Sequence, residues 1–406
     1  MKDILPREME IRDYVIQLIK DTYKSYGFVS METPCIEHIE NLCSKQGGDN
    51  EKLIFKILKR GEKLKIAEAQ TEEDVVDGGL RYDLTVPLAR YYSNYINELP
   101  SPFKALQIGS VWRADRPQRG RFRQFMQCDI DVLGDASYLS EVELILATTT
   151  LLGKLGFTGF TVNYNDRKLL KAIADYSGFQ EDDHDQVFII LDKLDKIGAD
   201  RVAEELKEIG YEQNHIERFM DLFQTITKDL AGIHYCKEVL GSILPEETST
   251  SLEMILSIVN ASKECEFQLV FNPTLVRGQS YYTGTIFEID MEGMSGSVAG
   301  GGRYDKMIGH FTGQDTPAVG FSIGFERIVM LLLEREYQVN TNQDKAAFLL
   351  EKNITKERMI EAFADAKKLR DEGAMVQIAT MKKNKKFQKE QLQEQGYMNI
   401  MEYYRE

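Results

Sequence analysis

The spacing of apolar residues predicts a mixture of helices and strands from the first residues onward. Apolar side chains recur every three or four positions over residues 7–26, which favours a helix with one buried face. Gly27 ends that pattern, and residues 28–33 read as a strand. Residues 287–292 alternate apolar and polar side chains, which predicts a strand with one buried face and one face toward water.

A second helix is expected at residues 140–155. Ser140 and Glu143 have the spacing of a capping box, and Gly156 follows as a stop signal. Together, the two helices and the strands favour an α+β fold with a largely antiparallel sheet.

The middle and the end of the chain differ from the rest in residue composition and in the spacing of apolar residues. Residues 166–250 are rich in charged residues and leucine at helical spacing, so we expect a helical insertion between the two parts of a discontinuous domain, 1–165 and 251–335. Residues 337–345 are polar and read as a linker. The remaining stretch, 344–406, is predicted to be a short α/β unit, with the successive strand, helix and strand at 346–350, 355–373 and 375–380.

Composition and net charge argue against several classes of protein. The chain has 406 residues and a net charge of −15, so a polyanion would have to be bound by a local basic patch. Five cysteines without a Cys-x-x-Cys pair, and five histidines without ligand spacing, argue against a disulfide framework or structural zinc. We find neither a secretory signal nor an apolar run long enough to span a membrane, and we expect a reducing, cytoplasmic compartment.

The densest chemical signal is the segment 111–123, which carries five arginines and one acid. Planar guanidinium groups pair phosphate oxygens two at a time. Pro117 and Gly120 place a turn in the middle, so we predict strand, loop and strand. Arginines on the strands would face a site, and those in the loop would reach an external polyanion. A solvated basic turn is the competing interpretation.

In two further segments a charged residue lies next to a residue that favours a turn or a helix start. Thr85 followed by Pro87 predicts a helix start, and Asp83 before it would hold a cationic group or simply cap the helix. Farther along, Arg277 and a flexible glycine precede the adjacent Tyr281 and Tyr282. Neighbouring residues of a strand face opposite sides, so only one of these tyrosines is expected to face a given cavity.

Two glycine-rich segments complete the set. Residues 299–305 contain three successive glycines, which allow a ligand to approach the backbone, although no P-loop is present. Residues 317–328 read as a strand of small residues followed by a helix whose first turn carries Glu326 and Arg327.

Taken in order, these segments resemble the motifs of class II aminoacyl-tRNA synthetases, and specifically those of the histidyl-tRNA synthetase family. The three motifs of the class are similar to residues 27–37, 113–131 and 317–327. The two histidine-specific motifs are similar to residues 277–282 and 301–305. The resemblance covers residues 1–335 well and the C-terminal part loosely.

The resemblance implies a ligase that activates L-histidine with ATP and transfers it to tRNA(His), and a homodimer formed through the first motif. Arg113 and Arg277 would be the catalytic pair on either side of the α-phosphate. Mg²⁺ is expected beside the phosphates. The substrate carboxylate is already ionised, so no protein base is required, whereas positive charge around phosphorus is. The implied ATP-binding residues are Arg113, Asp115, Arg121, Phe125 and Arg327.

The same resemblance implies the remaining contacts. The histidine ammonium and carboxylate would meet Asp83, Thr85 and Gln127. The imidazole would be read by Asp131 with Tyr281 or Tyr282. The tRNA acceptor stem would face Arg116, Gln118 and Arg119. The basic run 382–387 would touch the anticodon stem or form a solvated helix face.

Two departures and two rival functions bear on this interpretation. Gln279-Ser280 replaces the usual Leu-Asp, and the anticodon-binding-like region 344–406 is shorter than is usual in the family. One rival is a non-enzymatic histidine-binding regulatory subunit of ATP phosphoribosyltransferase, which would be expected to lose the motif arginines. The other, a kinase-fused sensor, would need kinase sequence that this chain lacks. The retained arginines favour the synthetase: Arg113, Arg121, Arg277 and Arg327.

Overall fold

The computed structural model describes residues 2–43, 49–116, 119–276, 281–294, 296–339 and 344–405. The chain divides into two compact units, residues 1–337 and 338–406. Within the described ranges, no helix is both long enough and apolar enough to cross a membrane.

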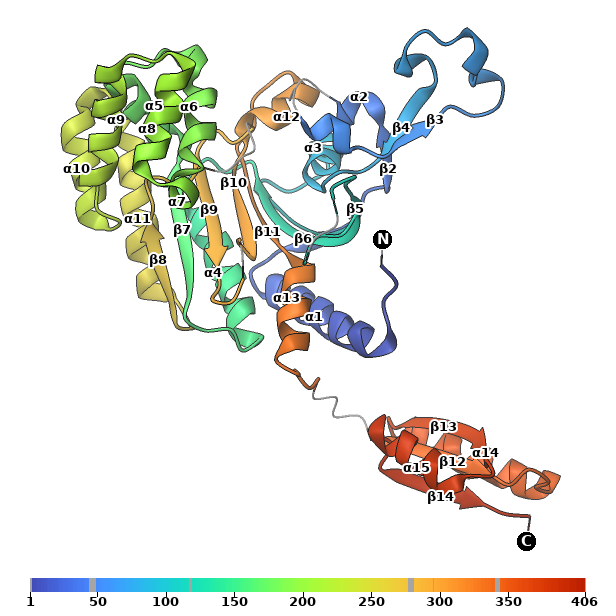
Figure 1. The fold of residues 1–406 in the computed structure, drawn as a ribbon. Coiled ribbons are helices and arrows are strands. Elements are labelled where there is room, and N and C mark those ends of the chain that lie inside the picture. The colour runs from blue at the N-terminus through green and yellow to red at the C-terminus, as the bar shows by residue number, and fades with distance from the viewer. Residues whose placement is uncertain are drawn as a thin grey trace. The chain divides into compact units, whose positions relative to one another are not determined.

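The first unit is built on an eight-stranded sheet with the strand order β1-β5-β6-β11-β10-β9-β7-β8 (Figure 1). The pairs β1–β5 and β7–β8 at its two edges are parallel, and the neighbouring pairs between them are antiparallel. The predicted α+β fold with a largely antiparallel sheet is confirmed. In chain order the strands are β1 (Val29–Met31), β5 (Phe103–Trp112), β6 (Gln124–Leu133), β7 (Phe160–Asp166), β8 (Phe267–Phe271), β9 (Thr285–Asp290), β10 (Ala299–Arg303) and β11 (Ala318–Ile323).

Four helices build the core with this sheet. The first of them, α1, buries the apolar stripe that predicted it, and Ile19 and Tyr23 are fully buried. It packs against α4 and α13, while α4 contacts β11 and α13 contacts β6. These helices are α1 (Pro6–Ser25), α4 (Leu139–Lys154), α11 (Glu246–Ser262) and α13 (Phe325–Glu334).

The predicted capping box of the second helix is wrong. Helix α4 begins at Leu139, so Ser140 already lies inside its first turn. The Ser140 hydroxyl donates to the Asp135 carboxylate at 2.8 Å, and Glu143 pairs with Lys104 at 2.5 Å. The two side chains are therefore used by the preceding turn and by a neighbouring strand.

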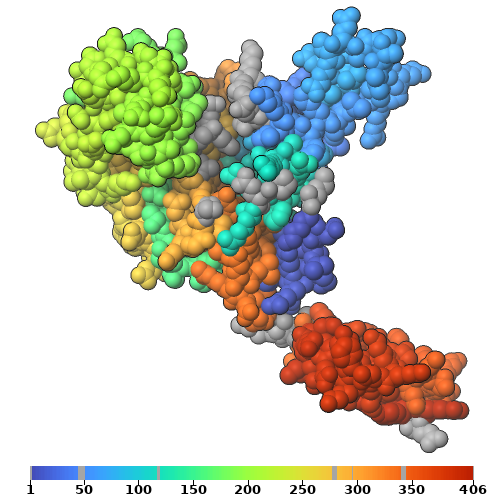
Figure 2. All heavy atoms as spheres, in the orientation of Figure 1, coloured from blue at the N-terminus to red at the C-terminus, as the bar shows by residue number. Residues whose placement is uncertain are grey.

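A small antiparallel sheet of order β2-β4-β3 projects from the same unit. It appears in blue in Figures 1 and 2, on the other side of the unit from the green helices. Its elements are β2 (Ile36–His38), the short helix α2 (Ile39–Leu42), β3 (Lys56–Leu58) and β4 (Val76–Leu80). Two further helices pack against each other beside the main sheet: α3 (Thr85–Tyr95) and α12 (Asp305–Thr312).

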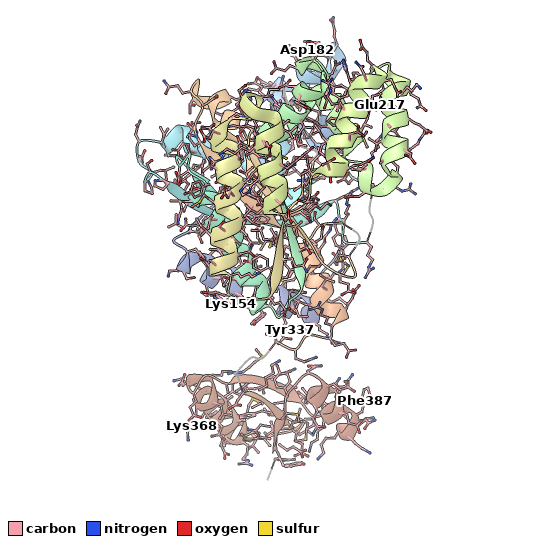
Figure 3. The ribbon with its side chains drawn as sticks, turned by 90° about the vertical axis from the view of Figure 1, so that its left-hand side faces the viewer. Lys154, Asp182, Glu217, Tyr337, Lys368 and Phe387 are labelled. Atoms are coloured by element: carbon pink, nitrogen blue, oxygen red, sulfur yellow. The ribbon has the colours of Figure 1, made fainter. Side chains whose placement is uncertain are left out.

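Helices alone fill the fully described stretch between β7 and β8, as the charged helical pattern predicted. Seen from the side, Asp182 and Glu217 in this stretch lie at the opposite end of the unit from Lys154 (Figure 3). Before α11 come α5 (Arg167–Ser177), α6 (His184–Leu191), α7 (Leu194–Ile197), α8 (Ala199–Ile209), α9 (Gln213–Thr225) and α10 (Leu230–Leu240).

The second unit is a parallel three-stranded sheet of order β13-β12-β14. The predicted strand, helix and strand are present, and the Thr355 hydroxyl caps the helix by accepting from the Arg358 N–H at 3.3 Å. The helix face considered for residues 382–387 overlaps helix α15, whereas strand β14 was not predicted. The elements are β12 (Lys345–Leu350), α14 (Lys356–Asp371), β13 (Met375–Thr380), α15 (Lys385–Glu394) and β14 (Asn399–Tyr403).

Candidate active site

A cavity of about 880 Å³ lies over the central strands of the first unit. The turns before α3 and β9, and the chain between β5 and β6, also contribute to its walls. Every predicted ATP- or histidine-binding residue within the described ranges lines it. These residues are Asp83, Thr85, Arg113, Asp115, Arg121, Phe125, Gln127, Asp131, Tyr281, Tyr282 and Arg327.

Strand β6 carries the acidic side of this cavity. Alternate residues of a strand face the same side, and Gln127, Asp129 and Asp131 all line the cavity. The residues between them, Cys128 and Ile130, are fully buried. The strand therefore separates an apolar core from a polar cavity.

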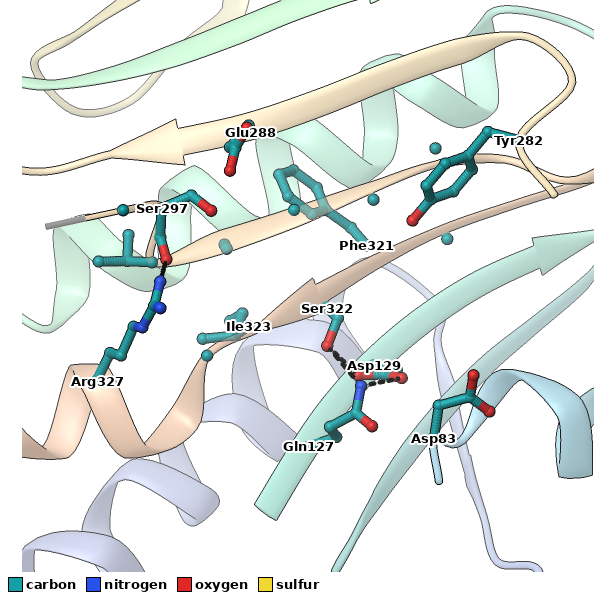
Figure 4. A pocket seen from close by; sticks show the side chains of 18 of the residues that line it. Asp83, Gln127, Asp129, Tyr282, Glu288, Ser297, Phe321, Ser322, Ile323 and Arg327 are labelled. Carbon is teal, nitrogen blue, oxygen red and sulfur yellow. Dashed lines mark hydrogen bonds between the residues drawn. The ribbon is translucent and has the colours of Figure 1, made fainter. Parts of the chain in front are cut away.

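Asp129 is the centre of a hydrogen-bonded cluster (Figure 4). The Ser322 hydroxyl donates to it at 2.5 Å, and the Gln127 amide nitrogen donates at 3.4 Å. Burial raises the pKa of the Asp129 carboxyl well above its ordinary value, and the neighbouring Asp131 raises it further. Among the described residues, the Gln127 amide oxygen is buried without a hydrogen-bond partner. That oxygen is an available acceptor beside the cavity.

Asp131 is held by a tyrosine and accommodated by a glycine. The Tyr304 hydroxyl donates to it at 2.6 Å. Burial raises the pKa of Asp131 to about 7, the Tyr304 hydroxyl opposes that rise, and nearby Asp83 adds to it. A Cβ at Gly320, on the next strand, would lie 1.9 Å from the Asp131 carboxylate oxygen. The position therefore requires glycine.

Asp83 adds a third buried carboxylate. It accepts the Val86 N–H from the first turn of α3 at 3.1 Å, one residue before the cap position at Leu84, and it also lines the cavity. Burial raises the pKa of Asp83 too. Three buried acids that resist ionisation beside one cavity favour a cationic ligand, because its charge offsets the cost of ionising them.

Arg113 brings positive charge into the same cavity, close enough to Asp83 and Asp129 to oppose the rise in the pKa of both carboxyls. Its guanidinium lies 4.2 Å from the ring centre of Tyr82 and 5.2 Å from that of Phe125. Its Nε donates to the Tyr82 carbonyl at 3.1 Å. The predicted strand, loop and strand around it are confirmed, since β5 ends at Trp112 and β6 begins at Gln124.

Arg327, in the first turn of α13, contributes a second cation. Its guanidinium donates to the Ser297 carbonyl beside the cavity (Figure 4). The turn between β5 and β6 rests on the same helix, because a Cβ at Gly120 would lie 3.4 Å from the Arg327 side chain. In that turn, Arg119 forms an ion pair with Glu334.

The paired tyrosines behave differently from the prediction. Tyr281 and Tyr282 precede β9 in a turn, with ring centres 4.6 Å apart, and both line the cavity. The expectation that only one would do so was wrong, because it assumed a strand at this position. The polar side of β9 also lines the cavity through Glu288 and Asp290, and thus does not simply face bulk water.

Four predicted residues remain to be accounted for. Arg116 and Arg119 fall outside the cavity lining. Gln118 and Arg277 lie outside the described residues.

Sequence reasoning missed several residues that line the cavity. Asp129 has the same strand spacing as Gln127 and Asp131, so alternation alone could have identified it. Tyr304 lay within a segment that was noted for its glycines and for its resemblance to a histidine-specific motif, but the residue was given no role of its own. No sequence signal pointed to the corner of the helical stretch at residues 191–196, which also contributes to the lining.

Comparisons with known proteins agree on one family. The family profile described as "Histidyl-tRNA synthetase" matches residues 1–328. The histidine–tRNA ligase of Leifsonia xyli subsp. xyli is 44% identical over 341 residues, which cover 82% of this chain and 79% of the relative. The histidine–tRNA ligase of Christiangramia forsetii is 36% identical over 391 residues, which cover 93% of this chain and 85% of the relative.

Solved structures share the fold. The histidyl-tRNA synthetase of Nostoc sp. PCC 7120 superposes with a TM-score of 0.79 at 27% identity, covering 98% of this chain and 88% of that one. An ATP phosphoribosyltransferase regulatory subunit/histidyl-tRNA synthetase from Bacillus halodurans also gives a TM-score of 0.79, at 20% identity, over 100% of this chain and 97% of that one. At that identity the second likeness concerns the fold alone.

Proposed function

The chain belongs to the histidyl-tRNA synthetase family, and from that premise we propose that it activates L-histidine with ATP and transfers it to tRNA(His). The observation that carries the proposal is the composition of one cavity. Its cationic side, with Arg113, Arg121 and Arg327, suits a triphosphate, and its acidic side, with Asp83 and Asp131, suits an amino-acid cation.

On the cationic side, the arginines bind and orient ATP. Arg113 and Arg277 flank the α-phosphate, while Arg121 and Arg327 hold the β- and γ-phosphates. Adenine stacks on Phe125, on the face away from the Arg113 guanidinium, and Asp115 contacts the adenine end. The attacking group is the histidine carboxylate, so catalysis consists of alignment and of stabilising charge on the pentavalent phosphorus. Removing one such preorganised donor typically costs about 10²–10³-fold in rate.

On the acidic side, the pocket selects histidine. Asp83, Thr85 and Gln127 bind the ammonium and carboxylate groups. Asp131 reads an imidazole nitrogen together with Tyr281 or Tyr282, and Tyr304 holds Asp131 in place by its 2.6 Å hydrogen bond. A pocket that expects a hydrogen-bonding side chain rejects apolar amino acids by about 10⁴–10⁵, since its own polar groups would be left unpaired.

Mg²⁺ fits beside the phosphates. The described residues hold no group of three or more His, Cys, Asp or Glu side chains that could form a metal cage. Mg²⁺ in nucleotide sites is usually bound by one or two carboxylates plus phosphate oxygens. Glu288 and Asp290, which line the cavity, would supply those carboxylates, and the ion would neutralise phosphate charge.

The rest of the chain serves tRNA. Arg116, Gln118 and Arg119 face the acceptor stem, and the Arg119–Glu334 ion pair opens to release a guanidinium for a phosphate. Residues 166–250 form an insertion in the catalytic domain, which comprises 1–165 and 251–335. Residues 344–406 form an anticodon-binding-like domain, in which the basic run 382–387 meets the nucleic acid.

The enzyme works as a cytoplasmic homodimer. The dimer is supported by the resemblance of residues 27–37 to the first motif of the class. The cytoplasm is supported by five free cysteines. Sedimentation of the purified protein tests the dimer, since a monomeric mass would contradict it.

The regulatory-subunit alternative is not favoured. The curated relatives cited above are ligases, and Arg113, Arg121 and Arg327 line the cavity. The deciding experiment is ATP–pyrophosphate exchange that depends on L-histidine, followed by charging of tRNA(His). Exchange with charging supports the synthetase, and the absence of both would favour the regulator.

A further inference from the structure

One buried carboxylate joins three segments that are far apart in the sequence. Glu326 accepts two hydrogen bonds from the Arg12 guanidinium, at 2.5 and 2.9 Å, although 314 residues separate them. The same carboxylate accepts the Met126 N–H at 3.0 Å. Arg12 is 7% exposed and Glu326 is 9% exposed. The arrangement therefore ties helix α1 to strand β6 and helix α13.

The position of this carboxylate follows from the sheet. Strand β6 pairs with β11 from Leu133 as far as Cys128, opposite Ile323. Beyond that point β11 ends and the chain turns into α13, while the other edge of β6 stays paired with β5 to Gln124. Glu326 thus accepts the hydrogen bond that Met126 can no longer make to a strand.

Both ends of this link adjoin proposed ATP contacts. Glu326 directly precedes Arg327, and Met126 directly follows Phe125; both of these neighbours line the cavity. The Arg12 guanidinium also lies 4.8 Å from the ring centre of Phe325, and Glu8 is 3.9 Å away on the same helix. Of the histidine contacts on β6, Asp131 lies on the part that β11 still supports. Gln127, which directly follows Met126, is held instead by its hydrogen bonds to Asp129 and Ser322.

We propose that Arg12 is a positioning residue for ATP: by fixing Glu326, it sets the spacing between Phe125 on β6 and Arg327 on α13. The inference rests on the proposed function. A displacement of about 1 Å at a reacting group can cost roughly 10²-fold in rate. Arg12 therefore acts on the adenine and phosphate contacts and leaves the histidine contacts in place.

Kinetics of the full-length protein test this directly. Histidine-dependent ATP–pyrophosphate exchange is measured for wild type, Arg12→Gln and Arg12→Lys, with Arg7→Gln as the matched control, because Arg7 is an exposed arginine on the same helix. We expect Arg12→Gln to lower kcat/KM for ATP by about 10²-fold, with a raised KM for ATP and an unchanged KM for histidine. Arg12→Lys should be intermediate, because lysine lacks the planar fork.

A double variant separates positioning from folding. Arg12→Met with Glu326→Gln removes both buried charges, and no unpaired carboxylate is left to destabilise the fold. We expect its melting temperature to exceed that of Arg12→Gln while its KM for ATP stays high. A wild-type KM for ATP in the double variant, or in Arg12→Gln, would overturn this inference and leave the proposed function standing. Wild-type protein without exchange activity would overturn the proposed function, and this inference with it.

Discussion

Replacing Gly320 by alanine tests whether histidine recognition depends on where Asp131 stands. The added Cβ would lie 1.9 Å from an Asp131 carboxylate oxygen and 2.9 Å from its carboxyl carbon. Gly320 is paired with Asp131 on one side and with Gly302 on the other, so the backbone has little room to retreat. The carboxylate must therefore move by roughly 1.5–2 Å to reach an ordinary contact distance.

Such a displacement should lower kcat/KM for histidine by about 10²-fold in pyrophosphate exchange. The KM for ATP serves as the internal control, because Phe125 and Arg327 lie away from the added methyl group. Thermal unfolding of the variant, followed in parallel, establishes that the protein is folded. Gly320→Ala protein with a wild-type KM for histidine would show that the position of Asp131 does not govern recognition.

Other expectations concern charge and its partners. Burial raises the pKa of Asp131 to about 7 even though the Tyr304 hydroxyl lowers it, so Tyr304→Phe should move the pH midpoint of the KM for histidine upward from that value; an unchanged profile contradicts this. The folded-state pKa of Asp131 lies above its ordinary value, so its contribution to stability is complete near pH 4 and lost as pH rises through 7. Wild type should therefore lose melting temperature relative to Asp131→Asn over that interval. Arg303 donates two hydrogen bonds to buried Glu141, at 2.7 and 2.8 Å. Arg303→Met leaves that carboxylate unpaired and should lower the free energy of unfolding in urea by about 3–5 kcal/mol; a loss under 1 kcal/mol would show that this ion pair does not stabilise the fold. Arg119→Ala should raise the KM for tRNA by roughly tenfold, as expected for one charge-assisted hydrogen bond, while pyrophosphate exchange stays at the wild-type rate.

The parts of the fold that sequence predicts are those governed by local periodicity. The helix at 7–26 and the strand–helix–strand at 346–380 follow from side chains a few positions apart. The observed bounds of these elements differ from the predicted bounds by two residues or fewer. The capping box at Ser140 failed because Asp135, outside the considered pair, competes for the hydroxyl. Helix α15 was considered only as a solvated helix face because few of its residues are apolar, and strand β14 is too short to give a clear alternating pattern.

The candidate site shows the same division. The ATP- and histidine-binding residues named from the motif resemblance line one cavity where the structure describes them, yet the resemblance gave no distances between them. The link between Arg12 and Glu326 depends on where β11 ends, which no local pattern specifies. Similarly, the need for glycine at position 320 arises from a carboxylate on the neighbouring strand. Contacts between strands and helices that are distant in sequence are set by tertiary packing, and local patterns do not record them.

The glycines of β10 and β11 have a consequence for inhibitors. A Cβ at Gly301 would lie 2.0 Å from the Gly320 carbonyl oxygen, and one at Gly302 would lie 2.7 Å from the Thr285 carbonyl oxygen. A compound that rests on this part of the floor would contact peptide groups that substitution can hardly alter without disturbing the sheet. Resistance would then have to arise from the rim, where side chains such as Lys196 can change freely.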